Sequence, residues 1–182
     1  EDMVTSIKEV WSLPGEKIEE RFNLEPGEGA SIDCFGEGAC MGMLGSGFIY
    51  TNKDSLSVGI GVSVDDVMQR RIPPNNVLDY FKSHPSVKQL LKDATLEEFS
   101  AHLIPEYGFK KFYEPYGNGY LIVGDAAGYV NTSLYHEGTN YATASGLHAG
   151  ETAIEAKQKG DFSKATLASY KKRLKESFVL QD

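Results

Sequence analysis

Between Ser55 and Ser63 every second residue is apolar, and each residue between them is serine or glycine. This period of two is the pattern of a β-strand with one buried face, because successive side chains point to opposite sides of a sheet. Asn52-Lys53-Asp54 just before it has the composition of a turn, and another apolar run begins at Phe48. Residues 48–64 therefore predict a hairpin with one face against a core.

The residues before this hairpin predict further regular structure. β-Forming residues from Val4 to Leu13 indicate a strand that ends at Pro14-Gly15, and Glu16 to Phe22 indicates one or two helical turns. Residues 25–47 are rich in glycine, so they predict either a loop or a strand whose backbone another group approaches closely.

Three later segments have apolar residues at helical spacing. From Asn75 to Leu91 this spacing is interrupted at Ser83-His84-Pro85, which predicts two short helices. A long helix is predicted from Thr139 to Lys159, ended by Gly160, and a last one from about Ser163 to Val179. The sequence thus predicts an α+β fold, in which an antiparallel sheet carries packed helices.

Composition excludes several classes of protein. With 182 residues, 41% of them hydrophobic, the chain can form one sizeable core. Acidic residues exceed basic ones by 26 to 18, and no Lys/Arg stripe with interleaved aromatic residues occurs, which argues against a nucleic-acid partner. No apolar run of about 18 residues occurs, so we expect a soluble, cytoplasmic protein. Cys34 and Cys40 match neither a disulfide framework nor a zinc site, and they are either a redox pair or two small hydrophobic residues.

The segment from Tyr120 onward carries the chemistry. Tyr120-Leu121-Ile122-Val123 is typical of a strand buried on both faces, and Gly124-Asp125-Ala126-Ala127-Gly128 follows it. Glycine lets a backbone approach a ligand, a carboxylate after a strand accepts hydrogen bonds from sugar or ribityl hydroxyls, and amides at a helix start attract negative charge. Together with the helix entry at Glu137-Gly138, these residues predict half of a cofactor pocket. One face of the long helix carries only small residues, where we expect a close neighbour: Ala142, Ser145, Gly146, Ala149, Gly150 and Ala153.

Residues 120–153, YLIVGDAAGYVNTSLYHEGTNYATASGLHAGETA, resemble the second flavin-binding motif of one family of flavoproteins. These are the FAD-dependent oxidoreductases of the FixC and electron-transfer flavoprotein:quinone oxidoreductase group, which includes geranylgeranyl reductases. GDAAG alone is a weak signal, but GDAAG followed at this distance by EGTNYATASG is specific. Residues 45–62 and 100–108 resemble the family's substrate-domain strands and the stretch that leads back to the flavin domain. The resemblance covers roughly residues 4–180.

The resemblance implies an FAD site and no metal site. Asp125 would bind the ribityl chain, with the backbone of residues 126–128 near the pyrophosphate, while the start of the long helix would face the O2/N1 side of the isoalloxazine. The cofactor-binding residues that it implies are Gly124, Asp125, Ala126, Ala127, Gly128, Gly138, Thr139 and Asn140. The implied fold is that of PHBH-like flavoproteins. Residues 1–108 would form part of a substrate- or acceptor-binding domain, and residues 109–182 the C-terminal part of the FAD-binding domain with the following helix.

The family's N-terminal GxGxxG fingerprint does not occur in the sequence, nor does a four-cysteine iron–sulfur array. We therefore expect this chain to be a C-terminal piece of a protein about twice as long, because the AMP half of FAD needs a βαβ unit that these residues do not encode. Alone, the chain should bind FAD weakly or not at all.

For the full-length protein the resemblance implies electron transfer from an electron-transfer flavoprotein to a quinone or a ferredoxin-like iron–sulfur acceptor. A geranylgeranyl-reductase-like enzyme that reduces prenyl-lipid double bonds stays open, although the aromatic-proline motif of such enzymes does not occur here. A non-catalytic binding domain with the same fold is the third alternative. Peripheral membrane contact through Lys171 to Lys175 is also open, against a solvated helix face.

Several other residues have both a functional and a structural interpretation. His136 and Glu137, beside Tyr135, would either transfer protons near the flavin or cap the helix. His102 and His148 are expected to be packing or surface residues, and His84 has no functional interpretation. A group of aromatic residues would line an apolar channel or belong to the core: Phe109, Phe112, Tyr113, Tyr116 and Tyr120.

Overall fold

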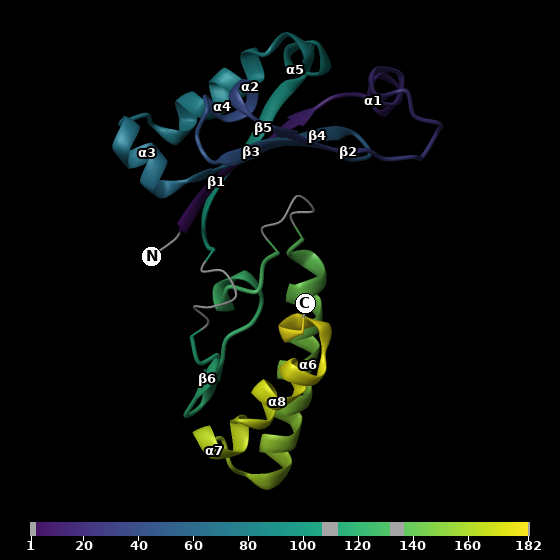
Figure 1. Ribbon diagram of the computed structural model, residues 1–182. Coiled ribbons are helices and arrows are strands. Elements are labelled where there is room, and N and C mark those ends of the chain that lie inside the picture. The colour runs from purple at the N-terminus through teal and green to yellow at the C-terminus, as the bar shows by residue number, and fades with distance from the viewer. Residues whose placement is uncertain (1–2, 107–112, 132–136, 182) are drawn as a thin grey trace. The chain divides into compact units, whose positions relative to one another are not determined.

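The computed structural model describes residues 3–106, 113–131 and 137–181, and the chain divides into two compact units (Figure 1). The N-terminal unit is Asp2–Leu103 and the C-terminal unit is Ile104–Asp182. Each unit has its own cluster of buried hydrophobic side chains. The assignment of residues 1–108 to an acceptor domain and of residues 109–182 to a flavin domain stays a prediction.

A five-stranded sheet of order β2-β3-β4-β1-β5 forms the N-terminal unit. β4 pairs with both β1 and β3, and β3 pairs with β2, in each case antiparallel, so the predicted antiparallel sheet and its hairpin are confirmed. The elements follow one another as β1 (Met3–Ser12), α1 (Gly15–Phe22), β2 (Ser31–Phe35), α2 (Glu37–Cys40), β3 (Gly45–Thr51), β4 (Ser55–Ser63), α3 (Val64–Arg70), α4 (Pro74–Ser83), α5 (Pro85–Leu90) and β5 (Thr95–Pro105).

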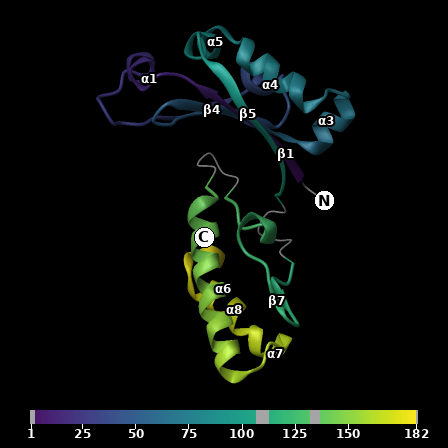
Figure 2. The ribbon, with the colours of Figure 1, turned by 180° about the vertical axis from the view of Figure 1, so that it is seen from behind.

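The alternation within β4 decides which face of the sheet is covered. Leu56, Val58 and Ile60 are fully buried, and their cross-strand partners in β1 point to the same side. Helices α2, α4 and α5 lie over this face, while α1 and α3 lie at opposite ends of the sheet (Figures 1 and 2). The apolar half of the alternation thus faces a helix-covered core, as predicted.

The glycine-rich residues 25–47 form β2, α2 and the start of β3, and they include one close approach. A Cβ atom on Gly47 would lie 2.7 Å from Cζ of Phe81, a buried side chain of α4. Glycine at this position therefore lets α4 pack directly on the sheet. Of the two interpretations of this segment, the closely approached strand is correct for β3.

The helices that follow β4 are partly as predicted. The break between α4 and α5 falls at His84, with Pro85 opening α5, so the two predicted short helices are confirmed. Helix α3 was not predicted, because the strand pattern runs straight into it. Its signal is local: the Ser63 hydroxyl accepts a hydrogen bond from the amide of Asp66, and acidic residues occupy the first turn.

The C-terminal unit is built around α6, whose predicted bounds and left-handed Gly160 C-cap (φ 64°) are confirmed. Tyr129 and Tyr141 pack with Tyr170, Leu174 and Val179 in its buried cluster. The elements are β6 (Tyr116–Gly117), β7 (Tyr120–Leu121), the 3₁₀ helix η2 (Gly124–Ala127), α6 (Thr139–Lys159), α7 (Lys164–Leu167), α8 (Ser169–Glu176) and the 3₁₀ helix η3 (Phe178–Leu180).

Two predictions for this unit are wrong in detail. The last helix is not continuous but consists of α7, α8 and η3. The hydroxyls of Ser169 and Ser177 donate to the carbonyls of Thr166 and Leu174, and such side-chain bonds compete with regular helix. Extended backbone at Ser177 (φ −110°, ψ 167°) then separates η3 from α8.

The second wrong prediction is the strand buried on both faces at residues 120–123. β7 contains two residues only, Tyr120 is 52% exposed and Val123 is 38% exposed. Within the described residues β7 pairs with β6 alone, so no second neighbour covers it. An apolar run specifies burial only when the surrounding sheet is complete.

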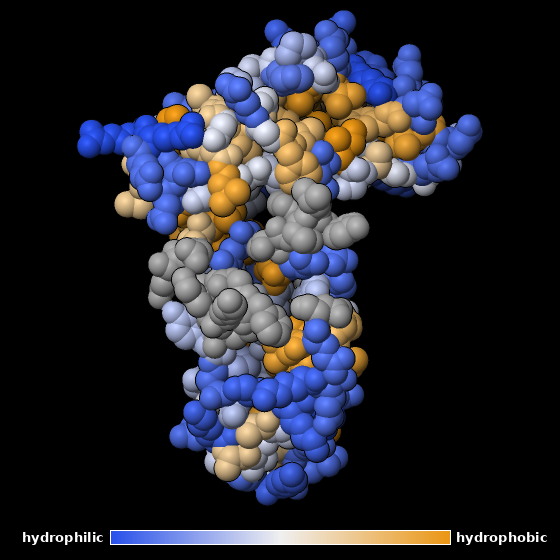
Figure 3. Space-filling view, in the orientation of Figure 1, coloured by the Kyte–Doolittle hydropathy of each residue, from blue (hydrophilic) through white to orange (hydrophobic). Residues whose placement is uncertain are grey.

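The small-residue face of α6 is divided between two environments. Ser145 and Ala149 are buried, together with Thr152 and Ala156, whereas Gly146, Gly150 and Ala153 are exposed. Leu147 and Ile154, about 60% exposed, lie on the same side as these glycines. Apolar surface is visible over α6 and the C-terminal helices in the space-filling view, between charged side chains (Figure 3).

Candidate functional site

The GDAAG segment folds as a tight turn that two glycines make possible. Gly124 has φ 62° and Gly128 has φ 77°, both in the left-handed region that favours glycine. The amide of Gly128 donates to the carbonyl of Asp125 at 2.8 Å, and the amide of Tyr129 donates to the carbonyl of Gly124 at 3.1 Å. Asp125 therefore sits on a backbone turn of fixed shape.

This turn rests against the N-terminal half of α6. The amide of Gly124 donates to the hydroxyl of Ser145 at 3.0 Å, and that hydroxyl donates to the carbonyl of Ala142 at 3.1 Å. A Cβ atom on Gly124 would lie 3.2 Å from Cβ of Ala142, tighter than most real contacts. The structure therefore brings η2 and the first turns of α6 together, and Ser145 is a residue whose bonding role the sequence did not reveal.

At its N-terminus α6 begins without a side-chain cap, because the N-cap residue is Gly138. The first amides of a helix lack partners within the helix and give this end a partial positive charge. Thr139 and Asn140 are both exposed there. A helix end of this kind suits a ligand atom that carries negative charge.

Glu137, just before α6, forms hydrogen bonds to two asparagines. Its two carboxylate oxygens accept hydrogen bonds from the side-chain amides of Asn131 (3.1 Å) and Asn140 (3.3 Å), and its carbonyl accepts from the amide of Asn131 (2.8 Å). These bonds reach no backbone amide of α6, so they test neither interpretation of Glu137, proton transfer or helix capping. Tyr135 and His136 lie outside the described residues.

Two tyrosines of the C-terminal unit, Tyr129 and Tyr170, are buried. The hydroxyl of Tyr170 donates to the carbonyl of Ile122 at 3.0 Å. Burial raises the pKa of Tyr170 to about 12, and burial together with the neighbouring Tyr170 raises the pKa of Tyr129 well above its ordinary value. Both hydroxyls therefore stay neutral at physiological pH, and the Tyr170 hydroxyl positions the backbone before Gly124.

Among the residues that the structure describes, the other candidates do not assemble into a second centre. Cys40 is buried and its pKa is raised to about 11 by burial and by Cys34, so its thiol is protonated and unreactive; burial and Asp33 raise the pKa of Cys34 as well. These observations support two small hydrophobic residues. Of the aromatic group, Tyr113 and Tyr120 are exposed and Tyr116 is half-buried, whereas Phe109 and Phe112 lie outside the described residues.

Basic residues on α8 are paired with carboxylates. Lys171 Nζ lies 2.8 Å from Glu114, and Arg173 bonds to Glu151 and Glu155 at 3.2 and 2.5 Å. This is the arrangement of a solvated, ion-paired face. In the part of the chain that the structure describes, no helix has the length and apolar character needed to cross a bilayer, and no three His, Cys, Asp or Glu side chains gather as metal ligands.

Curated relatives match the chain along its whole length. FixC of Azotobacter vinelandii is 40% identical and FixC of Bradyrhizobium diazoefficiens is 44% identical, each over 183 aligned positions that cover all of this chain. The chain is thus similar to part of each FixC protein. The "Probable electron transfer flavoprotein-quinone oxidoreductase YdiS" of Escherichia coli (strain K12) is 39% identical over 97% of the chain and 41% of that protein. No protein-family model matches the chain.

These matches confirm the resemblance to the FixC and electron-transfer flavoprotein:quinone oxidoreductase group, which was expected over roughly residues 4–180. The chain spans about two fifths of the length of the FixC relatives, because the aligned segment covers 42% of each.

Solved structures give the fold. A geranylgeranyl bacteriochlorophyll reductase-like protein of Thermoplasma acidophilum superposes with a TM-score of 0.64 at 21% identity, over 96% of this chain and 39% of that one. The flavin-dependent brominase Bmp2 superposes with a TM-score of 0.58 at 16% identity, over 94% of this chain and 40% of that one. The predicted flavoprotein fold is thus confirmed, and it is shared with reductase-like and halogenase proteins that differ in chemistry.

Proposed function

We propose that the chain is the acceptor-domain and flavin-contacting part of an FAD-dependent oxidoreductase that carries electrons from an electron-transfer flavoprotein to a quinone or iron–sulfur acceptor. The junction of η2 and α6 carries the proposal: the Gly124 turn is held on Ser145 beside an open helix N-terminus, in a chain 40% identical to FixC. The similarity to YdiS, a probable electron transfer flavoprotein-quinone oxidoreductase, supports the donor and a quinone as acceptor.

The residues at this junction fit a flavin. Asp125 stands on a rigid turn where its carboxylate suits ribityl hydroxyls, and the backbone of residues 126–128 is compact enough to run beside a pyrophosphate. The start of α6 at Gly138, Thr139 and Asn140 suits the electron-rich O2/N1 edge of an isoalloxazine. Bound FAD would supply the electron-carrying group, and these residues would hold it and stabilise its negative charge when reduced.

The sheet of the N-terminal unit supplies a candidate surface for the acceptor. The face opposite the helix-covered core carries Gly59 and Gly61. Gly61 lies between Ser6 and Ser46, whereas Gly59 lies between Lys8 and Phe48, and the Phe48 ring covers it. Phe48 and Tyr50 lie on this face as a stacked pair, with ring centroids 4.9 Å apart. The small residues around Gly61, beside these stacked rings, suit a planar apolar group such as a quinone.

The test uses a form of the protein extended to the length of the FixC relatives. It should purify yellow, with flavin absorbance, and should oxidise reduced electron-transfer flavoprotein when a quinone is present. Turnover of geranylgeranyl lipid alone would favour the prenyl-reducing alternative. A colourless extended protein without turnover would favour the non-catalytic binding domain and end the proposal.

A further inference from the structure

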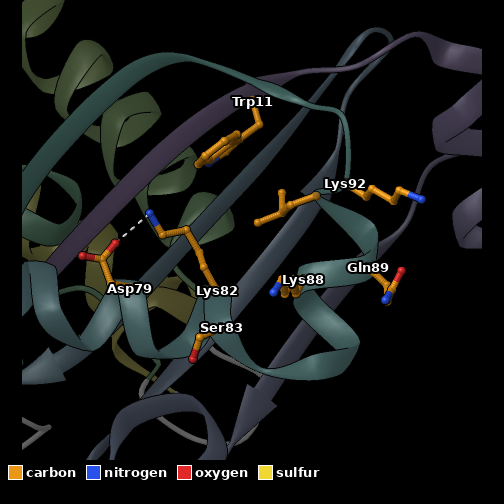
Figure 4. A pocket seen from close by; sticks show the side chains of 8 residues that line it. Trp11, Asp79, Lys82, Ser83, Lys88, Gln89 and Lys92 are labelled. Carbon is orange, nitrogen blue, oxygen red and sulfur yellow. Dashed lines mark ion pairs between the residues drawn. The ribbon is translucent and has the colours of Figure 1, made fainter.

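A cavity of about 580 Å³ lies in the N-terminal unit, away from the sheet face that carries Gly59 and Gly61, between β1 and the helices α4 and α5 (Figure 4). Small-molecule sites in proteins are typically clefts of about 300–1,000 Å³ with an apolar lining and a few convergent polar groups. The cavity is lined by Trp11, Asp79, Lys82, Ser83, Lys88, Gln89, Leu91 and Lys92.

One wall of this cavity is fixed by a network of charged side chains. Lys82 donates to both carboxylate oxygens of Glu9, at 3.0 and 2.9 Å, and pairs with Asp79 at 2.9 Å. The indole N–H of Trp11 donates to Glu9 at 2.9 Å, and Nζ of Lys82 lies 5.4 Å from the centroid of the Trp11 ring. Glu9 and Asp79 therefore more than offset the charge of Lys82, and Glu9 also holds the Trp11 ring in place.

The rim of the cavity carries further positive charge, from Lys88 and Lys92. Lys88 and Lys92 are exposed, and neither forms an ion pair within the described ranges of the chain. Because the whole chain has a net charge of −8, this rim is a local exception. Such a rim attracts an anionic group.

The floor between these cations is apolar. Trp11 and Leu91 are half-buried and pack against the core of the N-terminal unit, leaving part of each side chain toward the cavity. A ligand that fills this site gains most from an apolar body joined to a charged head.

We propose that this cavity binds a small amphiphilic anion, with its apolar body on Trp11 and Leu91 and its carboxylate or phosphate head between Lys88 and Lys92. The site lies entirely within Asp2–Leu103, and none of its lining residues belongs to the proposed flavin junction. The inference is therefore independent of the proposed function, and a failure of either leaves the other standing.

Trp11 is the single tryptophan of the chain, so its fluorescence reports on this cavity directly. The 182-residue chain is titrated with octanoate, octyl phosphate and octan-1-ol, and heteronuclear NMR shifts are recorded in parallel. Octanoate or octyl phosphate should change Trp11 emission saturably, and the tighter of the two identifies the preferred head group. Octan-1-ol should bind at least about fivefold more weakly, because it lacks the charge that two exposed lysines attract. Equal binding of the alcohol, or no saturable change with either anion, would overturn the proposal.

A charge-matched pair of variants separates the site from general electrostatics. The double variant Lys88→Gln/Lys92→Gln should raise the dissociation constant of the anion about five- to tenfold, since both rim charges are removed. The control Lys53→Gln/Lys175→Gln changes the net charge equally at exposed lysines outside the cavity and should leave binding unchanged. An equal loss in both variants would refute the proposed position of the anion.

Discussion

A few residues with special backbone or bonding requirements determine the candidate flavin junction. Gly124 combines a left-handed φ with a contact to Ala142 that leaves little room for a Cβ atom. Ser145 satisfies the amide of Gly124 inside the unit, where an unbonded polar group would be costly. Gly124 and Ser145 together fix the turn that carries the Asp125 carboxylate.

The role of Asp125 is testable in the extended protein. Asp125→Ala should raise the FAD dissociation constant about 10- to 100-fold, because a hydrogen bond to a charged group contributes about 1.5–3 kcal/mol. Flavin content after purification and a fluorescence titration with FAD measure the loss. Asp65→Ala, at an exposed position of α3, is the matched control. Full flavin retention in Asp125→Ala would remove this residue from the proposed site.

The pair of Glu9 and Lys82 gives a prediction about stability. Glu9 is only 7% exposed, so Lys82→Met should lower the free energy of unfolding by about 3–5 kcal/mol by leaving a buried carboxylate without its partner. Glu9→Gln/Lys82→Met should recover most of this loss, because the charge is gone and Gln still accepts from Trp11. Urea denaturation of the 182-residue chain measures both variants. A double variant as unstable as the single one would contradict this explanation.

The same pair predicts the behaviour of the protein at alkaline pH. Burial lowers the pKa of Lys82, but hydrogen bonds and charge from Glu9 and Asp79 outweigh it and raise the pKa above the ordinary 10.5. A raised lysine pKa adds stability that is fully present below the unfolded value and is lost as pH rises through the folded value. Denaturation midpoints should therefore fall above about pH 10.5 more steeply in the wild-type chain than in Glu9→Gln/Lys82→Met.

At the scale of elements, α6 has one face that the described chain covers and one that it does not. A Cβ atom on Gly146 or Gly150 would meet nothing within 4 Å. Leu147 and Ile154 are exposed beside them. The expected close neighbour of this face is therefore not among the described residues, and we propose that it belongs to the nucleotide-binding part of a longer protein.

Whether alanine at one of these glycines raises or lowers the stability tests this proposal. Gly150→Ala should stabilise the 182-residue chain by up to about 1 kcal/mol, because alanine is the better helix former at an open position. In the extended protein the same change should be destabilising, since the face would then be packed. Thermal unfolding of both forms decides the question. Stabilisation in both forms would show that the face stays open.

The small residues around Gly61 give a prediction about the acceptor. A Cβ atom on Gly61 would make only ordinary contact, 3.4 Å from Val4, so valine is tolerated there. Gly61→Val in the extended protein should raise the KM for quinone about tenfold and leave the flavin content unchanged, because the added side chain lifts the acceptor off the sheet. An unchanged KM would place the acceptor elsewhere.

At the scale of the whole molecule, two compact units share a chain that spans about two fifths of its relatives. Each unit has a core, yet the segments proposed to contact a flavin all lie in the C-terminal unit. The AMP half of FAD needs a dinucleotide-binding unit that these residues do not encode.

The 182-residue chain should accordingly bind FAD about 100-fold more weakly than the extended protein, a difference of about 3 kcal/mol from the contacts to the AMP half. Fluorescence titration of FAD with each form measures the two dissociation constants. Equal affinities would mean that the chain holds the whole cofactor by itself.

The sequence alone determined the elements whose signals are local. The alternation in β4, the turn before it, the break at His84 and the end of α6 at Gly160 each follow from the residues that occupy them. The motif around Asp125 also indicated the family, because residue types at fixed spacing carry that information without any tertiary context.

Only the tertiary structure decided which side chains are covered. Tyr120 and Gly150 follow patterns typical of burial but are exposed, whereas Ser145 and Tyr170 acquire their bonding roles from partners distant in sequence. Burial and cross-chain hydrogen bonds depend on which neighbours are present, and a periodic pattern specifies only that a neighbour is needed.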